Sequence, residues 1–110
     1  MRDTDRSVAL EFKNRLAGLV QLVDFCVFGS RARGDAAEDS DMDVFVEVEN
    51  LDRDLKERVH DTAWEVGFEN FMMTSPLIFA RDELENSPFR SSPIVKAITE
   101  EGLHISHERS

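Results

Sequence analysis

The chain of 110 residues contains one cysteine, has fewer basic than acidic side chains, and lacks any long apolar run. Cys26 cannot form an internal disulfide, and its position within an apolar segment favours a small buried side chain over a nucleophile. A chain without disulfides fits a reducing compartment, so we expect a cytoplasmic protein.

The shortage of positive charge restricts the classes of partner. Thirteen Lys and Arg stand against 23 Asp and Glu, which gives a formal charge of −10. A field of this sign repels the phosphate backbone of nucleic acids. No apolar run approaches the roughly 20 residues that span a bilayer, and "MRDTDRSVAL" carries acids where a signal peptide needs a basic start and an apolar stretch. Nucleic-acid substrates and membrane insertion are therefore disfavoured.

The length suits one domain, residues 1–110, with a short flexible tail from about residue 104. Apolar spacing, caps and turn residues predict an alternation of helices and strands. The expected elements are a helix over 7–21 capped by Ser7, strands over 22–28 and 42–49, a helix over 52–66 stopped by Gly67, a strand over 68–80 with Pro76 at its end or at an edge position, a helical turn or loop over 80–88, and a helix over 93–101. We expect an α+β fold in which helices pack on one face of a small mixed sheet and leave the other face free for a site.

Two aspartates stand two residues apart where the second expected strand begins. Strand alternation places Asp41 and Asp43 on the same face, and such a pair repels unless a divalent cation neutralises it. Carboxylate oxygens are ligands that suit Mg²⁺. A solvated acidic loop is the alternative; it accounts well for Glu38 and Asp39 but poorly for the two strand carboxylates.

A Gly-Ser turn follows the first expected strand directly. Gly29 permits close approach of the backbone to a ligand, and the turn at Ser30 can present N–H groups and a hydroxyl to a phosphate. "GSRARGDA" is neither a P-loop nor a dinucleotide-binding fingerprint. A phosphate-holding turn beside paired carboxylates is what phosphoryl or nucleotidyl transfer requires.

Together these residues resemble a family signature. "GSRARG" over 29–34 followed by "SDMD" over 40–43 is similar to the G-S-x-A-R-G…S-D-x-D motif of minimal nucleotidyltransferases of the DNA polymerase β superfamily. The resemblance implies a polymerase β palm-like fold. It also implies that Gly29 and Ser30 hold the triphosphate, that Arg33 orients the loop or contacts phosphate, and that Asp41 and Asp43 bind one or two Mg²⁺ ions.

The resemblance further implies transfer of a nucleoside monophosphate, with ATP or another nucleoside triphosphate as donor, to a hydroxyl. Single-domain members often pair with a HEPN-domain protein and act as antitoxins that adenylylate it. The acidic charge agrees with a protein acceptor. A small-molecule nucleotidyltransferase of the antibiotic-modifying kind is a further alternative; it needs an acceptor-binding domain that 110 residues do not supply, although a homo-oligomer could provide the missing wall.

The chain departs from the family pattern at the third catalytic carboxylate. That residue usually follows the second helix, but "FENFMMTSPLIF" contains no aspartate; Glu69 is the nearest acid, and Met72, Met73, Thr74 and Ser75 occupy the stretch where the aspartate is expected. Glu69 is therefore the candidate third catalytic residue, with an ordinary exposed side chain as the alternative reading. The loss also keeps open a second hypothesis, a weak or inactive nucleotidyltransferase-like module that neutralises a partner protein by docking.

Four aromatic residues follow in the same region. Trp64, Phe68, Phe71 and Phe79 could form an adenine-stacking set, but aromatic residues at helical or strand spacing usually belong to the core. We expect them to be buried.

Overall fold

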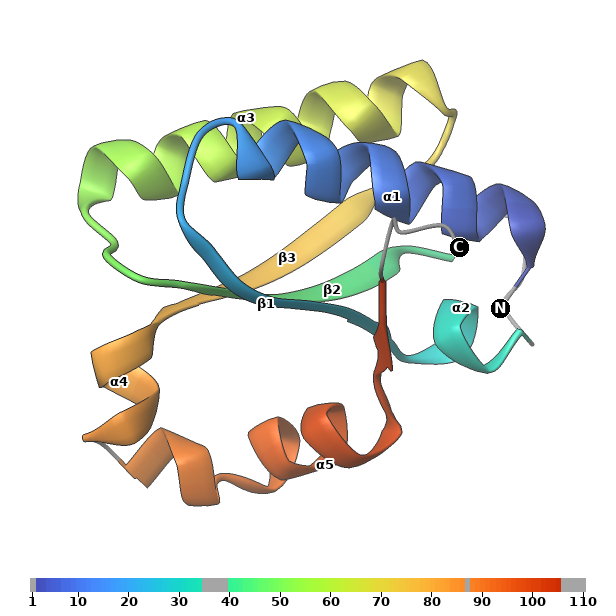
Figure 1. Cartoon of the computed structure of the whole chain (residues 1–110). Helices are drawn as coiled ribbons and strands as arrows, with labels where there is room; N and C mark the ends of the chain where they lie inside the picture. The colour runs from blue at the N-terminus through green and yellow to red at the C-terminus, as the bar shows by residue number, and fades with distance from the viewer. Residues whose placement is uncertain (1, 35–39, 87, 106–110) are drawn as a thin grey trace.

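The computed structural model of the chain describes residues 2–34, 40–86 and 88–105. Its centre is a four-stranded sheet in the order β3, β2, β1, β4 (Figure 1). Strand β1 (Leu22–Phe28) is antiparallel to β2 (Met42–Val48) and to the short β4 (Leu103–His104), whereas β3 (Thr74–Ala80) is parallel to β2. The mixed sheet with its helices confirms the predicted α+β class.

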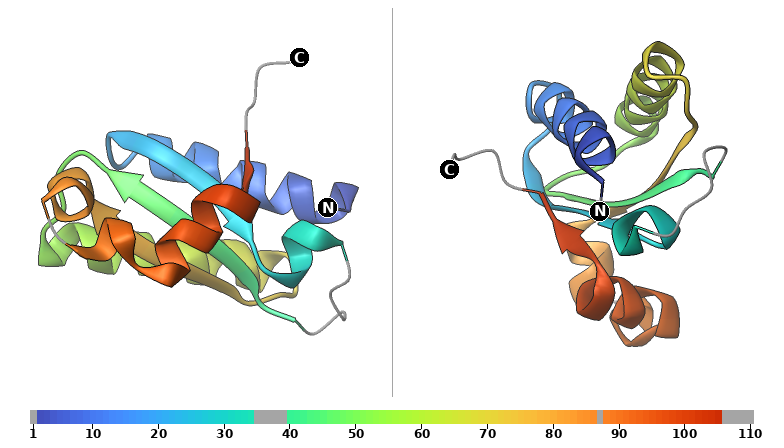
Figure 2. Two further views of the ribbon diagram at one scale, coloured as in Figure 1. Left: turned by 90° about the horizontal axis from the view of Figure 1, so that it is seen from below. Right: turned by 90° about the vertical axis from the view of Figure 1, so that its right-hand side faces the viewer.

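Two long helices cover one face of this sheet. Helices α1 (Asp3–Ala17) and α3 (Arg53–Glu69) lie side by side on it (Figure 2). The side chain of Asp52 caps α3 by accepting a hydrogen bond from the Leu55 N–H at 2.8 Å. The core between helices and sheet is built from fully buried side chains that include Phe12, Leu16, Met42, Val44, Val46, Val59 and Val66.

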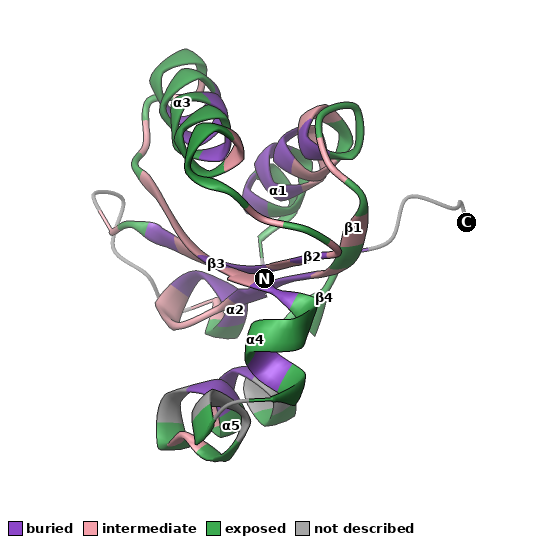
Figure 3. Cartoon of the chain, turned by 90° about the vertical axis from the view of Figure 1, so that its left-hand side faces the viewer, coloured by how far each residue is buried: buried purple, intermediate pink, exposed green. Residues whose placement is uncertain are grey.

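The opposite face carries shorter elements. Helix α4 (Arg81–Glu85), the 3₁₀ segment η1 (Pro88–Ser91) and helix α5 (Pro93–Glu101) lie across part of it (Figures 2 and 3). They enclose a second buried cluster of Cys26, Phe45, Leu84, Val95 and Ile98. The expectation that this face is free is therefore wrong where Phe45 and its neighbours pack, and Asp43, two residues before Phe45 on the strand, lies outside this cluster.

Cys26 is buried within this second cluster, as its sequence context predicts. Burial raises the pKa of its thiol to about 12, and the negative charge of Asp24 contributes to the increase. The thiol is therefore protonated at neutral pH, which agrees with a packing role rather than a nucleophilic one.

Several element boundaries differ from the prediction. Helix α1 begins at Asp3, so Ser7 lies inside it and is not its cap. Helix α3 continues past Gly67 to Glu69, and β3 begins only at Thr74. Pro76 lies within β3, which is an edge strand of the sheet. Most of the expected tail, residues 106–110, lies outside the described residues, and Ile105 just before it is buried.

Gly67 has a packing role rather than a terminating one. A Cβ at this position would lie 2.4 Å from the carbonyl oxygen of Met72, because the chain folds back over α3 there. The Met72 N–H donates to the Gly67 carbonyl at 2.9 Å, and the Phe71 N–H donates to the Phe68 carbonyl at 3.4 Å. These two bonds have the Schellman pattern, with Phe71 at its left-handed position (φ +58°).

Three of the four aromatic residues expected in the core are on the surface. Phe79 is partly buried against the second cluster, but Trp64, Phe68 and Phe71 are exposed. Trp64 and Phe68 lie on the side of α3 that faces away from the sheet, which their spacing alone could not reveal. Within the described residues, no helix has both the length and the apolar character needed to cross a bilayer.

Candidate functional site

Two carboxylates lie at the beginning of β2. Asp41 directly precedes the strand and is exposed, whereas Asp43 is its second residue and is half-buried. Burial raises the pKa of the Asp43 carboxyl, and the negative charge of Asp41 raises it further. Charging both groups therefore costs free energy, which a bound divalent cation would offset.

The turn after β1 packs directly against Asp43. The backbone of Phe28, the last residue of β1, pairs with Asp43, and Gly29 follows with φ +79° and ψ −158°. A Cβ at position 29 would lie 2.7 Å from Oδ2 of Asp43. Only glycine adopts this backbone conformation readily, and only glycine leaves room for the carboxylate. The backbone at Gly29 therefore lies directly against the carboxylate of Asp43, a side chain that commonly binds metal ions.

A short helix, α2 (Ser30–Arg33), begins at once after this glycine. The Gly29 carbonyl accepts a hydrogen bond from the Arg33 N–H at 3.2 Å, which closes the turn. Ser30 is half-buried at the start of α2, beside Gly29, whereas the side chain of Arg33 is exposed at its end. The predicted triphosphate-binding pair, Gly29 and Ser30, is therefore adjacent to Asp43.

Arg31 connects the loop to helix α1. Its side chain is buried, and Nη1 lies 2.8 Å from Oδ1 of Asp5 on α1. Its Nε and Nη2 donate to the Ser40 carbonyl at 3.0 and 2.8 Å. The arginine thus ties α1 to the residue that precedes Asp41. Sequence reasoning missed this role because Asp5 was placed outside the first helix.

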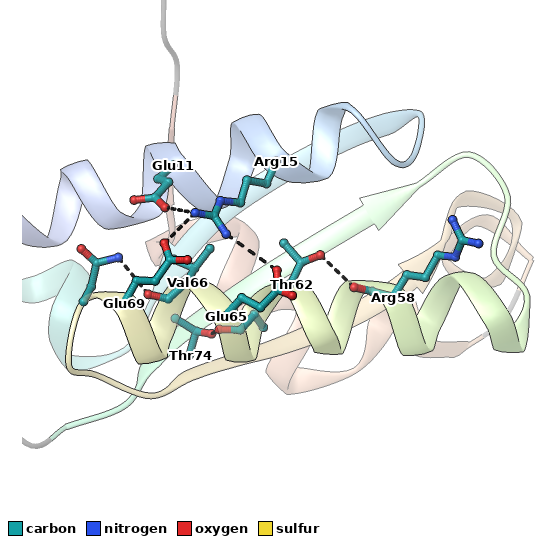
Figure 4. A network of polar contacts seen from close by, with 10 residues as sticks. Glu11, Arg15, Arg58, Thr62, Glu65, Val66, Glu69 and Thr74 are labelled. Carbon is teal, nitrogen blue, oxygen red and sulfur yellow. Dashed lines mark hydrogen bonds and ion pairs between the residues drawn. The ribbon is translucent and has the colours of Figure 1, made fainter.

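Glu69 is not brought to the aspartate pair. Because α3 extends to this residue, Glu69 lies on a helix rather than at the start of a strand, and its Oε1 lies 2.7 Å from Nη2 of Arg15 on α1 (Figure 4). The same guanidinium also contacts Glu11 at 2.6 Å and Glu65 at 3.8 Å. Over residues 2–34, 40–86 and 88–105, no group of three or more His, Cys, Asp or Glu side chains could hold a metal ion. This geometry does not provide the third carboxylate that Glu69 was expected to be.

Ser75 of the neighbouring strand β3 lies beside Asp41 and Asp43. Strands β2 and β3 align Ser75 with Asp43, and the Ser75 Oγ lies 3.3 Å from Oδ2 of Asp41. The neighbouring strand thus contributes a hydroxyl where the family pattern leads one to expect a carboxylate. Within the stretch 72–75, residue 75 is the one whose backbone pairs with Asp43.

The donor set fits a hard divalent cation bound together with a phosphate ligand. Two carboxylates and one hydroxyl supply oxygen atoms of the kind that Mg²⁺ prefers, and Mg²⁺ usually completes its coordination with water and substrate phosphates. Burial and the negative charge of Asp41 both raise the pKa of Asp43, so a cation bound to the pair would stabilise its charged form. Because Gly29 has no side chain, its backbone lies directly against the carboxylate of Asp43.

Comparisons with known proteins identify the family of the chain and a similar fold. A family model described as a nucleotidyltransferase domain matches residues 10–104. Among solved structures, a chain from a toxin–antitoxin complex crystallised with AMP-PNP is similar, with 16% identity, a TM-score of 0.59, and coverage of 92% of this chain and 72% of that chain. A chain from Sulfolobus solfataricus assigned as a nucleotidyltransferase has 18% identity, a TM-score of 0.49, and coverage of 90% and 77%. A comparison with curated proteins gave no match.

Proposed function

Because the chain belongs to the nucleotidyltransferase domain family, we propose that it transfers AMP from ATP to a hydroxyl of a partner protein, such as a HEPN-domain toxin. The observation that carries this proposal is how closely the turn at Gly29 approaches the Asp43 carboxylate. A Cβ added at Gly29 would lie only 2.7 Å from Oδ2 of Asp43. A triphosphate held at the turn would thereby lie beside the two aspartates.

Each residue of the site has a part in this proposal. Gly29 and Ser30 bind the triphosphate, Arg31 keeps the turn and Ser40 in position, and Asp41 and Asp43 hold Mg²⁺. Bound Mg²⁺ neutralises charge on the phosphates. The acceptor oxygen forms a bond to the α-phosphorus, the bond from that phosphorus to the bridging oxygen breaks, pyrophosphate leaves, and the acceptor proton passes to solvent.

Two further observations support ATP and a protein acceptor. The structural neighbour with a TM-score of 0.59 is a toxin–antitoxin complex that was crystallised with AMP-PNP, an ATP analogue. The formal charge of −10 disfavours a nucleic-acid acceptor. A cytoplasmic location is part of the same proposal.

Ser75 favours one alternative function. With a hydroxyl instead of a third carboxylate beside Asp41, the pair has fewer charges to hold metal and to accept the acceptor proton. A nucleotidyltransferase-like module that neutralises its partner by docking, with little turnover, is therefore the second candidate.

A transfer assay separates the two functions. The chain is incubated with α-labelled ATP, Mg²⁺ and the HEPN-domain protein encoded beside it, and label on that protein is measured. Transfer that is lost in the Asp41→Asn, Asp43→Asn variant, and kept in Asp82→Asn on exposed α4, is the expected result. Absence of transfer in the unmodified chain, with the partner still neutralised, would establish the docking module instead.

A further inference from the structure

The outer side of α3 and the turn after it form an apolar surface. We define this docking surface by Trp64, Phe68, Phe71 and Met73, whose exposed fractions are 64%, 70%, 94% and 61%. The rings of Trp64 and Phe68 stack with centroids 5.2 Å apart and planes 9° apart. All four side chains line a groove of about 780 Å³ that also reaches Pro76 on β3.

Phe71 is present at a cost to the fold. It occupies the left-handed position of the Schellman turn, where glycine is favoured, and its ring makes almost no contact with the rest of the chain at 94% exposure. A bulky residue with positive φ is a backbone outlier that points to a function outside folding. Trp64 lies on α3, about two helical turns before Phe71, and adds a second large apolar ring to the same surface.

From these observations we propose that the docking surface binds a partner protein through an apolar patch rimmed by Lys or Arg side chains. The area is large enough: at about 150–250 Å² per aromatic side chain, the exposed parts amount to about 600 Å², most of the ~800 Å² that one partner buries in a standard interface. Patches of this size on a monomer mark interaction sites.

The charges beside the surface indicate the chemistry of that partner. At 100° per residue, Asp61 and Glu57 lie on the same stripe of α3 as Trp64 and Phe68, one and two turns before Trp64, with Arg53 a further turn earlier, and the two acids are exposed. Within the part of the chain that the structure describes, neither acid takes part in an ion pair. A partner with basic side chains at the rim complements them.

A second copy of this chain fits the surface less well. Each copy carries a formal charge of −10, which opposes self-association. Addition of a strand to the edge of β3 is also hindered, because Pro76 has no N–H to donate. The occupant that agrees with these observations is a different protein, which binds through side chains and carries basic residues at the rim of its apolar patch.

The docking surface adjoins the aspartate site. The Met73 carbonyl accepts the Met42 N–H at 2.8 Å, and Met42 stands between Asp41 and Asp43. Ser75 follows Met73 by two residues and contacts Asp41. A protein bound at this surface therefore lies along the edge of the sheet that carries the site. The inference rests on the proposed function only in taking the docked protein to be the acceptor.

Trp64 provides a direct probe, because it is the single tryptophan of the chain. The full chain is labelled with 5-fluorotryptophan, the unlabelled HEPN-domain protein of the transfer assay is added, and the ¹⁹F resonance and the Kd are measured. We expect the resonance to move on binding. Phe68→Ser and Phe71→Gly should each weaken binding by about tenfold or more, and Asp61→Lys should weaken it as well.

Matched controls distinguish docking from misfolding. Leu19→Ser removes an exposed apolar side chain (40%) in the connection between α1 and β1, away from the surface, and should leave Kd unchanged. Phe71→Gly should raise the thermal unfolding midpoint while it weakens binding, because glycine suits the left-handed position. A loss of affinity in a more stable variant cannot come from unfolding.

The possible results separate this inference from the proposed function. A complex that moves the Trp64 resonance without label transfer would sink the transfer proposal and keep the docking surface. Label transfer without a shift of the Trp64 resonance would keep the transfer proposal and overturn the docking surface. The absence of a complex, self-association that depends on Trp64, or a shift caused by AMP-PNP alone would each overturn the docking surface.

Discussion

Replacing Asp43 by asparagine should stabilise the fold without Mg²⁺ and leave it less stable than the unmodified chain when Mg²⁺ is present. In the metal-free protein Asp43 and Asp41 are adjacent acids, and the pKa of Asp43 is raised by burial and by its neighbour. An asparagine side chain has nearly the same shape as aspartate without the charge. The variant should therefore be more stable than the unmodified chain without metal and less stable with it.

The magnitude follows from the spacing of the pair. Two residues along a strand separate the side chains by about 6.6 Å. With an effective dielectric constant of about 50, appropriate to one exposed and one half-buried group, unit charges at this distance repel by about 1 kcal/mol. That free energy corresponds to an increase of about 4 °C in Tm for a domain of this size. In contrast, Mg²⁺ at tenfold excess over its Kd should stabilise the unmodified chain by about 1.4 kcal/mol.

The pH dependence has a definite sign. The folded-state pKa of Asp43 is raised, so the folded chain holds this proton more tightly than the unfolded chain. Metal-free stability should consequently rise as pH falls through that pKa, and the advantage of the Asp43→Asn variant should shrink. Stabilisation by Mg²⁺ should shrink as well, because protons compete for the same oxygen atoms.

Urea unfolding followed by circular dichroism measures these effects, at pH 7 and pH 5, with Mg²⁺ and with EDTA. Asp82→Asn serves as the control because it removes an exposed carboxylate from α4. The reasoning is refuted if Asp43→Asn is destabilising in EDTA at pH 7, or if Mg²⁺ stabilises that variant as much as the unmodified chain.

Four further substitutions test individual residues. Gly29→Ala should cost about 1–3 kcal/mol through backbone strain and abolish AMP-PNP binding in calorimetry; retained affinity would contradict the turn's role. Ser75→Asp should lower the Mg²⁺ concentration needed for half-maximal transfer by about tenfold, and an unchanged requirement would show that this position is not the third ligand site. Glu69→Gln should leave transfer unchanged and lower stability by less than about 1 kcal/mol; a large loss of transfer would restore it as a catalytic group. Arg31→Ala should lower the free energy of unfolding by about 3–5 kcal/mol because Asp5 stays buried without its charge partner, and urea denaturation with a loss below about 1 kcal/mol would count against the clamp.

Strands β1 and β2 could be predicted because each has a clear local pattern of apolar residues. The β-branched run over 22–28 gives β1 its observed bounds, and strict alternation gives β2 within one residue. The start of α1 was not predictable from apolar periodicity, since Asp3, Thr4 and Asp5 are polar; acidic residues in a first turn are favoured by the helix dipole instead.

Within the site, sequence spacing identified the aspartates and the Gly-Ser turn but not their supporting contacts. The ion pair between Arg31 and Asp5 joins residues 26 positions apart, so no local pattern indicates it. The place of Ser75 likewise depends on the register between β2 and β3. Glu69 was misplaced because Gly67 resembles a helix stop, whereas the helix ends with Phe71 in the left-handed position.

The turn between α3 and β3 connects the two departures from an optimal fold. Stability alone would place glycine at position 71, where a left-handed side chain costs about 1–2 kcal/mol, and metal affinity alone would place an acid at position 75. The chain instead carries an exposed phenylalanine on the turn, whose course Gly67 fixes by close contact with Met72, and a serine four residues later at the start of β3. Under the proposed function, the docked protein and the aspartate pair lie along the same edge of the sheet, because Met73 bonds to Met42 and Ser75 contacts Asp41. We therefore expect transfer to require both the docking surface and the two aspartates.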